Sequence, residues 1–315
     1  MIPAASLFDP VLLQAPGARL RAARFAADPA VPARGACVLL NGQTEFIEKY
    51  FEVIDELRGR GFQVATMDWR GQGGSERLVP DARKSFVRDF SEYDDDLETL
   101  MREMVAPMAA ESGALPIALA HSMGGHILLR RLAARRDGFR AAAFSAPMIG
   151  ISFRGQRTWL VRLVTALQNR RGNQTGWVWG MEKRDPLKVN FATQLVTSDP
   201  QRFERTQMLL RQKPDLRLAG ATWGWLAAAM ASIAWLTAAG RPESIATPLL
   251  IVGAGADRIC LTPAAKAFAS RLPDARFIEI ANAGHEILME RAPFRRRFWR
   301  AFDAFMDEKA PRREE

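Results

Sequence analysis

The 315-residue sequence contains only two cysteines and three histidines. Cys37 and Cys260 lie far apart in the chain and cannot build a disulfide framework, which indicates a reducing compartment. Residues 1–20 lack a cationic start followed by an apolar run, so no secretory signal is predicted there. We therefore expect a cytoplasmic protein.

Acidic residues are in the minority: 35 Asp and Glu face 44 Lys and Arg, for a net charge of +9. With 25% charged and 48% hydrophobic residues, the composition excludes a disordered or collagen-like chain and provides for a substantial core. Internal repeats and low-complexity linkers are absent from the sequence. The length fits one large domain or two small ones.

Long hydrophobic runs are also scarce, and the one that stands out is Leu218–Gly240, which has no charged residue. It is long enough to cross a bilayer. However, it is mostly alanine, and its only strongly membrane-inserting residues are Leu218, Leu226, Ile233 and Leu236. The run therefore favours a buried helix in a soluble protein, with peripheral contact to lipid left open.

Short apolar runs alternate with amphipathic stretches through most of the chain. The pattern predicts strands over residues 36–40, 62–67, 115–120, 139–144, 249–252 and 276–280. It predicts helices over residues 46–57, 89–110, 123–136 and 263–271, and a terminal helix through residue 305. Such alternation is typical of an α/β protein with a mostly parallel central sheet and helices on both faces.

The alternation stops between residues 151 and 240. This segment holds six of the eight tryptophans, and its 13 Lys and Arg against five acidic residues account for +8 of the net charge of +9. We expect an α/β core formed by residues 1–150 and 241–315, interrupted by a mostly helical, basic insertion at residues 151–240.

A serine flanked by small residues lies where a predicted strand meets a predicted helix, in Ala-His-Ser-Met-Gly-Gly at residues 120–125. A tight turn of this kind holds the hydroxyl clear of the sheet at the positive end of the helix. The pattern predicts Ser122 as a nucleophile. The alternative is an ordinary serine that caps the helix.

A serine nucleophile needs a base, and the sequence offers three histidines. His121 and His126 lie at the N-terminus of the predicted helix, which disfavours the imidazolium that a base must form, so we expect both to be structural. His285 follows a predicted strand, within Asn-Ala-Gly-His-Glu. We predict His285 as the base; the alternative is a histidine at a helix terminus without a catalytic role.

The carboxylate that orients the base is predicted to be Asp257, which follows the strand at residues 249–252. The alternative is a turn aspartate paired with Arg258. The chain order Ser122, Asp257, His285 is the one that this topology requires. All three follow carboxyl ends of strands, where open α/β sheets have their sites.

An oxyanion needs two backbone N–H donors. We predict one from Met123, which follows the nucleophile, and one from Gln43 in the loop after the first buried strand. The Asn-Gly dipeptide at residues 41–42 is also typical of a simple turn, and the two interpretations are compatible.

Taken together, these motifs resemble the lysophospholipase and monoacylglycerol lipase branch of the α/β-hydrolase superfamily. The resemblance covers residues 34–307 and rests on Asn-Gly-Gln-Thr-Glu-Phe (41–46), Asp-Trp-Arg-Gly-Gln-Gly-Gly-Ser (68–75), His-Ser-Met-Gly-Gly (121–125), Asp-Arg (257–258) and Asn-Ala-Gly-His (282–285). It implies the α/β-hydrolase fold, with the insertion as a helical lid. It also implies catalytic roles for Ser122, Asp257 and His285, with Gln43 and Met123 as oxyanion donors.

The chain departs from this family pattern at two positions. Asn41 stands where histidine is usual, and Ala120 where glycine is usual. We expect Asn41 still to hold its loop by hydrogen bonds, and Ala120 to be small enough for the turn. Asp68 and Arg70 are expected to have structural roles in the turn after their strand.

Other chemistries lack their motifs. Gly71-Gln72-Gly73 has Glu76 at the third glycine position of a dinucleotide loop, and His285-Glu286 is not followed by the second histidine of a zinc helix. We therefore expect no cofactor and no metal. No nucleic-acid motif accompanies the basic surplus, which suggests instead an anionic membrane surface or a phosphorylated head group.

These features predict a serine ester hydrolase that acts on lipid esters through an acyl-enzyme, in the first place a lysophospholipase. Alternatives are a monoacylglycerol lipase, a general carboxylesterase, a peptidase, or a non-catalytic protein that binds an apolar ligand. The tryptophans of the insertion are expected either to line an acyl-chain pocket or to form the insertion's own small core. The oligomeric state is not predicted.

Overall fold

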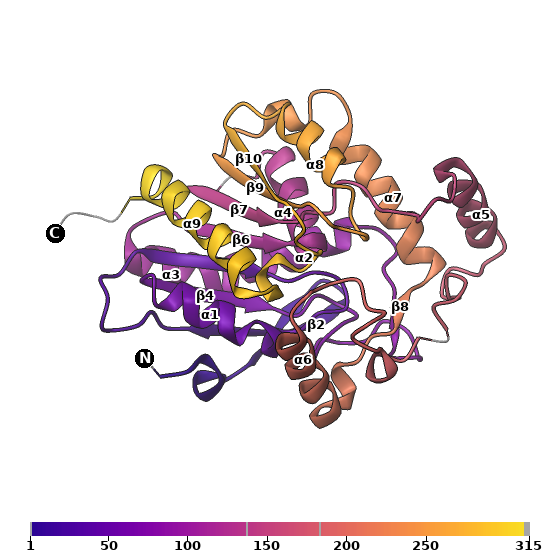
Figure 1. Cartoon of the computed structure of the whole chain (residues 1–315), viewed down its shortest axis with the longest axis horizontal. Helices are drawn as coiled ribbons and strands as arrows, with labels where there is room; N and C mark the ends of the chain where they lie inside the picture. The colour runs from indigo at the N-terminus through magenta and orange to yellow at the C-terminus, as the bar shows by residue number, and fades with distance from the viewer. Residues whose placement is uncertain (1, 137, 183, 312–315) are drawn as a thin grey trace.

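The computed structural model describes residues 2–136, 138–182 and 184–311. Its centre is an eight-stranded sheet in the order β1-β2-β4-β3-β6-β7-β9-β10 (Figure 1). The strands are β1 (Val11–Ala15), β2 (Ala18–Phe25), β3 (Gly35–Leu40), β4 (Phe62–Met67), β6 (Ile117–His121), β7 (Ala141–Ser145), β9 (Leu249–Ala254) and β10 (Ala275–Ile280). Of the strand pairs described in this sheet, β1–β2 and β2–β4 are antiparallel and the other five are parallel, so the predicted mostly parallel sheet is confirmed.

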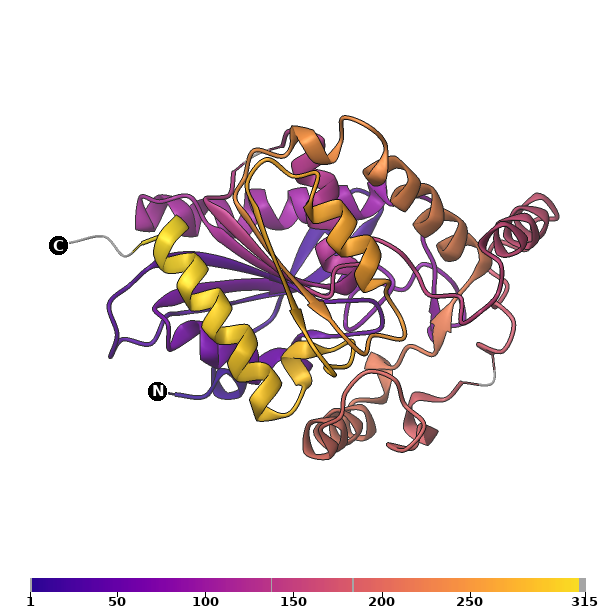
Figure 2. The same cartoon turned by 45° about the horizontal axis from the view of Figure 1, so that its top comes forward.

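Helices cover both faces of the sheet (Figures 1 and 2). One face packs against α1 (Phe51–Arg58) and α9 (Ala292–Lys309). The other packs against α2 (Ser91–Leu100), α3 (Ala106–Ser112), α4 (Ser122–Ala133) and α8 (Thr262–Ala269). The two faces give two separate apolar cores.

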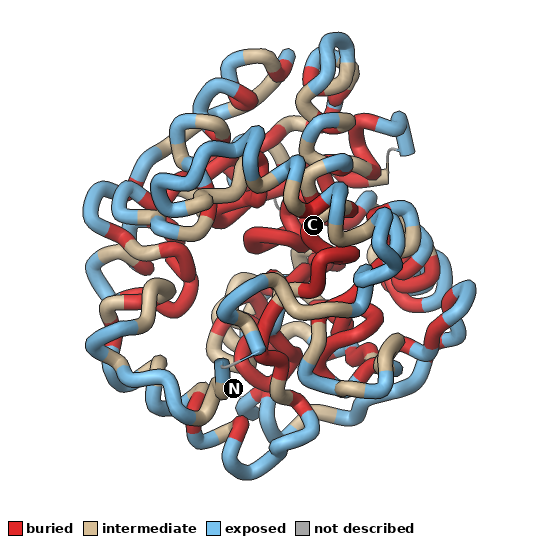
Figure 3. The backbone as a smooth tube through the Cα atoms, turned by 90° about the vertical axis from the view of Figure 1, so that its right-hand side faces the viewer, coloured by how far each residue is buried: buried red, intermediate tan, exposed pale blue. Residues whose placement is uncertain are grey.

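The central strands are apolar along their whole length because both of their faces are covered. In β3, Val38 and Leu40 belong to one core while Cys37 and Leu39 belong to the other, and all four are fully buried. Figure 3 shows the buried segments gathered inside a largely exposed periphery. This double burial explains why strand runs in the sequence do not alternate with polar residues.

The hairpin formed by β1 and β2 was not among the predicted strands. Its turn contains Pro16 and Gly17, and Gly17 has a φ of +77°, which glycine adopts readily. β1 lies at the edge of the sheet and exposes part of its apolar surface, including Leu12. β1 is short and only partly buried, so its sequence lacks the apolar run that marks the central strands.

The single helix predicted over residues 89–110 is in fact three consecutive segments. Between α2 and α3 lies a π-helical turn, Met101–Val105, and the last segment ends at Gly113, which has a left-handed conformation. The remaining predicted strands and helices lie within a few residues of those in the structure.

Residues 151–240 contain three α-helices: α5 (Thr158–Arg170), α6 (Pro200–Gln212) and α7 (Trp223–Thr237). Between α5 and α6 the described residues include a short 3₁₀ turn, Pro186–Lys188, and Trp177, which forms an isolated antiparallel bridge with Thr222. A two-residue strand, β8 (Gly220–Ala221), pairs with β5 (Lys84–Ser85) in parallel. Figures 1 and 2 both place α5 at the outer edge, beyond α7.

The uncharged run of residues 218–240 forms β8 and α7. Trp225, Ala228 and Leu236 of α7 belong to the core that also contains α4, so the predicted buried helix is confirmed. Among the described residues, no helix combines the length and apolar character needed to cross a membrane.

Candidate active site

Ser122 begins α4 directly after β6, at a sharp turn. Its φ is +49°, a left-handed backbone that non-glycine residues adopt at a cost and that is often found at functional sites. The turn also needs a glycine at position 124, because a Cβ there would lie 2.4 Å from the backbone oxygen of Asn41. The helix N-terminus thus approaches the loop after β3 as closely as the two backbones allow.

The structure brings the three predicted catalytic side chains into one hydrogen-bonded chain. His285 Nε2 lies 2.9 Å from Ser122 Oγ, and His285 Nδ1 lies 2.7 Å from Asp257 Oδ2. With Asp257 ionised, Nδ1 carries the proton and Nε2 is left to accept from the serine hydroxyl. Ser122 and His285 are both buried.

Asp257 pairs with His285 rather than with Arg258. Its second oxygen, Oδ1, accepts the backbone N–H groups of Ile259 and Cys260 at 2.8 and 2.9 Å. Burial opposes ionisation of Asp257, yet the hydrogen bond from His285 and these N–H groups lower its pKa overall. The carboxylate is therefore an anion held in one orientation.

Two neighbouring strands deliver Asp257 and His285 to the same edge of the sheet. β9 and β10 are parallel and in register, with Ala254 opposite Ile280. The loops that follow them are joined, because Ala256 N–H donates to the oxygen of Ala283 at 2.9 Å. This linkage explains how residues 28 positions apart meet.

The loop after β3 lies against the serine. A Cβ on Gly42 would lie 3.1 Å from Ser122 Cβ. The backbone N–H groups of the two predicted oxyanion donors, Gln43 and Met123, donate to no other described residue. The N–H group of Met123 follows Ser122 in the chain. That of Gln43 follows Gly42, whose position is in close contact with Ser122.

Asn41 holds this loop, as expected. Its Nδ2 donates to the oxygen of Met67 at 3.0 Å, and its own backbone oxygen accepts from Trp69 Nε1 at 2.9 Å. Asp68 and Arg70 are structural, as expected: Asp68 accepts from Ile47 N–H at 2.9 Å, and Arg70 pairs with Asp96 at 2.7 Å.

A buried charge network beneath the loop was missed by sequence reasoning. Lys49 Nζ lies 2.7 Å from Glu45 Oε1 and 2.6 Å from Glu286 Oε1. Glu45 Oε2 accepts from Gly42 N–H at 2.5 Å and from Tyr50 O–H at 2.7 Å. We call Glu45, Lys49, Tyr50 and Glu286 the buried charge network; it joins the loop after β3 to the residue after His285.

The two carboxylates of this network differ in acidity. Burial opposes ionisation of Glu45, but the Lys49 ammonium lowers its pKa to about 2. Burial raises the pKa of Glu286, which shares the same ammonium with a carboxylate that is already charged. Glu45 is therefore the stronger acid of the two, and it precedes Lys49 by four residues in the chain.

His121 and His126 make structural hydrogen bonds, as expected. His121 Nδ1 lies 2.9 Å from the backbone oxygen of Ser145, and His126 Nε2 lies 2.6 Å from Ser232 Oγ in α7. Burial lowers the pKa of His121 to about 4 and that of His126 to about 3. Both rings are neutral near pH 7.

Cys260 joins Asp257 and His285 in a group whose potential ligand atoms lie within 4.8 Å of one another. However, both ring nitrogens of His285 are used by hydrogen bonds. Burial also raises the pKa of the Cys260 thiol well above its usual value, so the thiolate that metals prefer is disfavoured. The group fits a hydrogen-bonded relay better than a metal centre.

A cavity of about 620 Å³ opens beside Ser122 and His285. Its walls are mostly apolar and come largely from residues 151–226, including Phe153, Val178, Leu195, Phe203, Leu210 and Leu226. Of the tryptophans in the insertion, only Trp225 lines it. Trp179 and Trp223 instead pack on each other, with ring centroids 5.2 Å apart.

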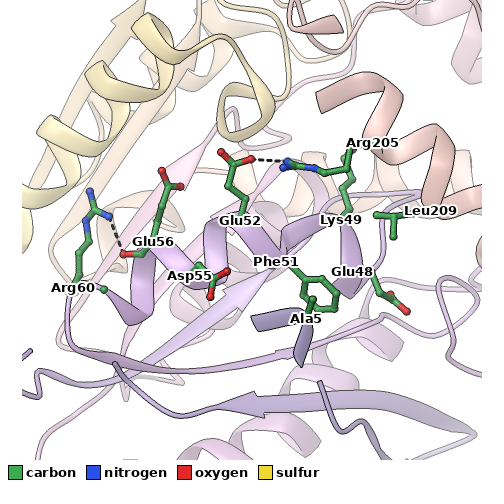
Figure 4. A pocket seen from close by; sticks show the side chains of 11 residues that line it. Ala5, Glu48, Lys49, Phe51, Glu52, Asp55, Glu56, Arg60, Arg205 and Leu209 are labelled. Carbon is green, nitrogen blue, oxygen red and sulfur yellow. Dashed lines mark hydrogen bonds and ion pairs between the residues drawn. The ribbon is translucent and has the colours of Figure 1, made fainter. Parts of the chain in front are cut away.

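A second hollow, between α1 and α6, contains no predicted catalytic residue (Figure 4). Its wall includes Glu52 of α1, which binds Arg205 of α6 at 2.6 Å. Glu52 also binds Arg202 of α6 at 2.5 Å, outside this wall. These contacts attach α6 to the core of the protein.

The family model described as serine aminopeptidase, S33, matches residues 31–292. The chain is 27% identical over 286 residues to a probable lysophospholipase L2 of Haemophilus influenzae, covering 90% of this chain and 87% of that protein. It is 28% identical over 265 residues to lysophospholipase L2 of Escherichia coli K12, covering 82% of this chain and 76% of that protein. A monoglyceride lipase structure from Saccharomyces cerevisiae is similar in fold, with a TM-score of 0.77, 17% identity, and coverage of 98% and 96%.

Replacing Gly124 with alanine is expected to lower the free energy of unfolding by about 1–3 kcal/mol, because the new Cβ would meet backbone oxygens that cannot move aside. Gly125→Ala is the matched control and should lose less stability. Its Cβ would meet the side chains of Pro147 and Phe144 at 3.1 and 3.2 Å rather than backbone oxygens. Urea denaturation of both variants tests this. Equal stabilities would contradict the close approach of α4 to the loop.

Replacing Lys49 with methionine is expected to lower the free energy of unfolding by about 3–5 kcal/mol, because two buried carboxyl groups would lose their shared cation. Arg205→Met is the control: its half-exposed ion pair with Glu52 is expected to contribute no more than about 1 kcal/mol. Urea denaturation compares the two. Similar small losses would show that the buried charge network is not essential to the fold.

Proposed function

The chain belongs to the serine aminopeptidase S33 family, in the lysophospholipase and monoacylglycerol lipase branch of the α/β-hydrolase superfamily, and we propose that it is a serine hydrolase of monoacyl lipid esters, specifically a lysophospholipase. The observation that carries this proposal is the hydrogen-bonded chain from Ser122 through His285 to Asp257.

In the proposed mechanism, Ser122 Oγ attacks the ester carbonyl while its proton passes to His285 Nε2, 2.9 Å away. The imidazolium that forms is stabilised by Asp257, which holds the Nδ1–H at 2.7 Å. His285 then gives the proton to the departing alcohol, and the acyl group stays on Ser122.

The backbone N–H groups of Gln43 and Met123 are proposed to bind the oxyanion. Each flanks the serine, and neither donates to another described residue. Because α4 begins at Ser122, its positive end adds to the stabilisation of negative charge there.

In the second half of the reaction, water takes the place of the alcohol. His285 removes a proton from the water, which attacks the acyl-enzyme, and the proton returns to Ser122 as the fatty acid leaves. His121 is adjacent to Ser122 but neutral, and its Nδ1 faces the oxygen of Ser145, so His285 is the base in both halves.

Residues 151–240 are proposed to act as a lid over the site, between core segments 1–150 and 241–315. They supply most of the apolar wall of the cavity beside Ser122. A mostly apolar cavity of about 620 Å³ suits one acyl chain. Together with the relatives named lysophospholipase L2, this favours a monoacyl lipid over a peptide.

Replacing Ser122 with alanine, or Asp257 with asparagine, is expected to lower kcat/KM by about 10⁴-fold or more, because the nucleophile or the correct histidine tautomer is lost. Rates on lysophospholipids, monoacylglycerols, p-nitrophenyl esters and aminoacyl amides test the reaction and its substrate class. Ser145→Ala, a buried serine on β7, is the control for general disruption.

An active Ser122→Ala enzyme would overturn the mechanism. Wild-type activity confined to the aminoacyl amides would overturn the substrate class and favour a peptidase. Tight binding of a monoacyl lipid without turnover of any ester would favour a non-catalytic binding protein.

We further propose a cytoplasmic protein that contacts an anionic membrane surface through α5. The helix exposes large apolar side chains, with Trp159 59%, Leu160 45%, Leu163 49% and Leu167 41% exposed. No acidic residue occurs between Ile151 and Met181, a stretch with five arginines. Apolar residues beside arginines are typical of helices that lie in a membrane interface.

Vesicle sedimentation tests this contact. We expect binding to vesicles rich in phosphatidylglycerol, weaker binding to phosphatidylcholine vesicles, and loss of binding with added salt. Trp159→Ser with Leu163→Ser should reduce binding, whereas Met208→Ser, on the exposed side of α6, should not. Equal binding by both variants would contradict a role for α5.

A further inference from the structure

Three arginines in the cavity wall have no acidic partner among the described residues. Arg154, Arg184 and Arg258 all line the cavity that contains Ser122, and all are exposed. Arg202, in the same wall, is instead bound to Glu52 and Asp199 at 2.5 and 2.7 Å. The three arginines are therefore available to a ligand, and Arg202 is not.

Arg154 and Arg258 lie on two segments that are joined to each other. Ile151 and Cys260 form an antiparallel bridge, and Ser152 N–H donates to the oxygen of Ile259 at 2.8 Å. Antiparallel pairing places the residues just after 152 beside those just before 259. Arg154 and Arg258 therefore belong to one rim of the cavity, next to the catalytic aspartate.

The acidic side chains of the site are bound to other partners and do not neutralise these three arginines. Both oxygens of Asp257 are engaged, one by His285 and one by backbone N–H groups. The two glutamates in the cavity wall, Glu45 and Glu286, are bound to Lys49. The cavity therefore combines mostly apolar walls with a cationic excess.

The backbone at Arg154 is strained. Its φ is +52°, and Gly155 follows at +89°. An arginine held in a left-handed conformation is unusual, and such strain tends to persist where the position of a side chain matters. The strained backbone is consistent with a functional position for the Arg154 side chain at this rim.

We propose that Arg154, Arg184 and Arg258 form a subsite for the phosphate of a monoacyl glycerophospholipid whose ester lies at Ser122. Guanidinium groups bind phosphate through paired, charge-assisted hydrogen bonds. The acyl chain would occupy the apolar wall, and the glycerol would lead from the ester to the phosphate at the cationic rim. This inference rests on the proposed ester hydrolysis and makes it specific, because a monoacylglycerol lacks the phosphate.

The test compares two substrates that differ only at the head group: 1-decanoyl-lysophosphatidylethanolamine and 1-decanoylglycerol, both kept below their micelle concentrations. Arg154→Gln and Arg258→Gln should each lower kcat/KM for the phospholipid by roughly ten-fold or more. Both should leave kcat/KM for 1-decanoylglycerol within about two-fold of wild type. Arg184→Gln should act in the same direction.

Arg211→Gln and Arg297→Gln are the matched controls. They remove the same charge at exposed positions that do not line the cavity, so they should change neither rate. If they lower the phospholipid rate as much as Arg154→Gln and Arg258→Gln do, the effect is general electrostatic attraction and the subsite is refuted. Unchanged ratios in all variants would refute it as well.

A second measurement identifies the group that is bound. sn-Glycero-3-phosphoethanolamine should inhibit p-nitrophenyl ester hydrolysis competitively, glycerol should not, and Arg258→Gln should remove the inhibition. Absence of inhibition by sn-glycero-3-phosphoethanolamine, or inhibition that persists in Arg258→Gln, would contradict the proposal.

Failure of the proposed function gives a different pattern, since then no ester is hydrolysed by wild type. In that case binding of 1-decanoyl-lysophosphatidylethanolamine to Ser122→Ala protein, measured by calorimetry, still tests the subsite. Binding weakened roughly ten-fold by Arg258→Gln would support it, and unchanged binding would refute it.

Discussion

The arrangement of the site depends on one imidazole and its two hydrogen bonds. His285 Nδ1–H donates to Asp257 at 2.7 Å, and His285 Nε2 accepts from the Ser122 hydroxyl at 2.9 Å. Each partner is itself fixed by the backbone: Asp257 by two N–H groups of its own turn, and Ser122 by the left-handed start of α4. Strand ends that are far apart in sequence therefore bring the three side chains into one hydrogen-bonded chain.

The loop after β3, residues 41–46, is held in place by buried charged groups. Glu45 accepts from the N–H of Gly42, while Lys49 joins Glu45 to Glu286, the neighbour of His285. Burying three ionisable groups is costly unless each is paired. This cost is offset by the ion pairs and hydrogen bonds of the network, which also link the loop beside Ser122 to the loop that carries His285. Glycines 42 and 124, which allow the two backbones to meet, complete this support.

Much of this arrangement could be predicted from the sequence because its signals are local. The strand Phe62–Met67 was predicted with its observed ends, since a mostly apolar run follows Gly61 and ends at a turn. The residues of the relay were predicted because each follows a strand. The hairpin at the sheet edge was missed because β1 is short and partly exposed, and tertiary pairing with β2 completes it. Lys49 was missed because its partner Glu286 is 237 residues away, and no local pattern reports such a contact.

Residues 151–240 supply most of the apolar wall of the cavity beside Ser122, and Arg154 and Arg184 of this segment line it together with Arg258. The central claim is that Ser122 carries the acyl group during turnover. Acid quenching of the wild-type enzyme during hydrolysis of 1-decanoyl-lysophosphatidylethanolamine, followed by mass spectrometry of its peptides, tests this directly. A decanoyl group on the peptide that contains Ser122, and on no other, is the predicted result. A decanoyl group on another residue of the wild-type enzyme would contradict it. A Ser122→Ala enzyme that still hydrolyses the substrate would contradict it as well.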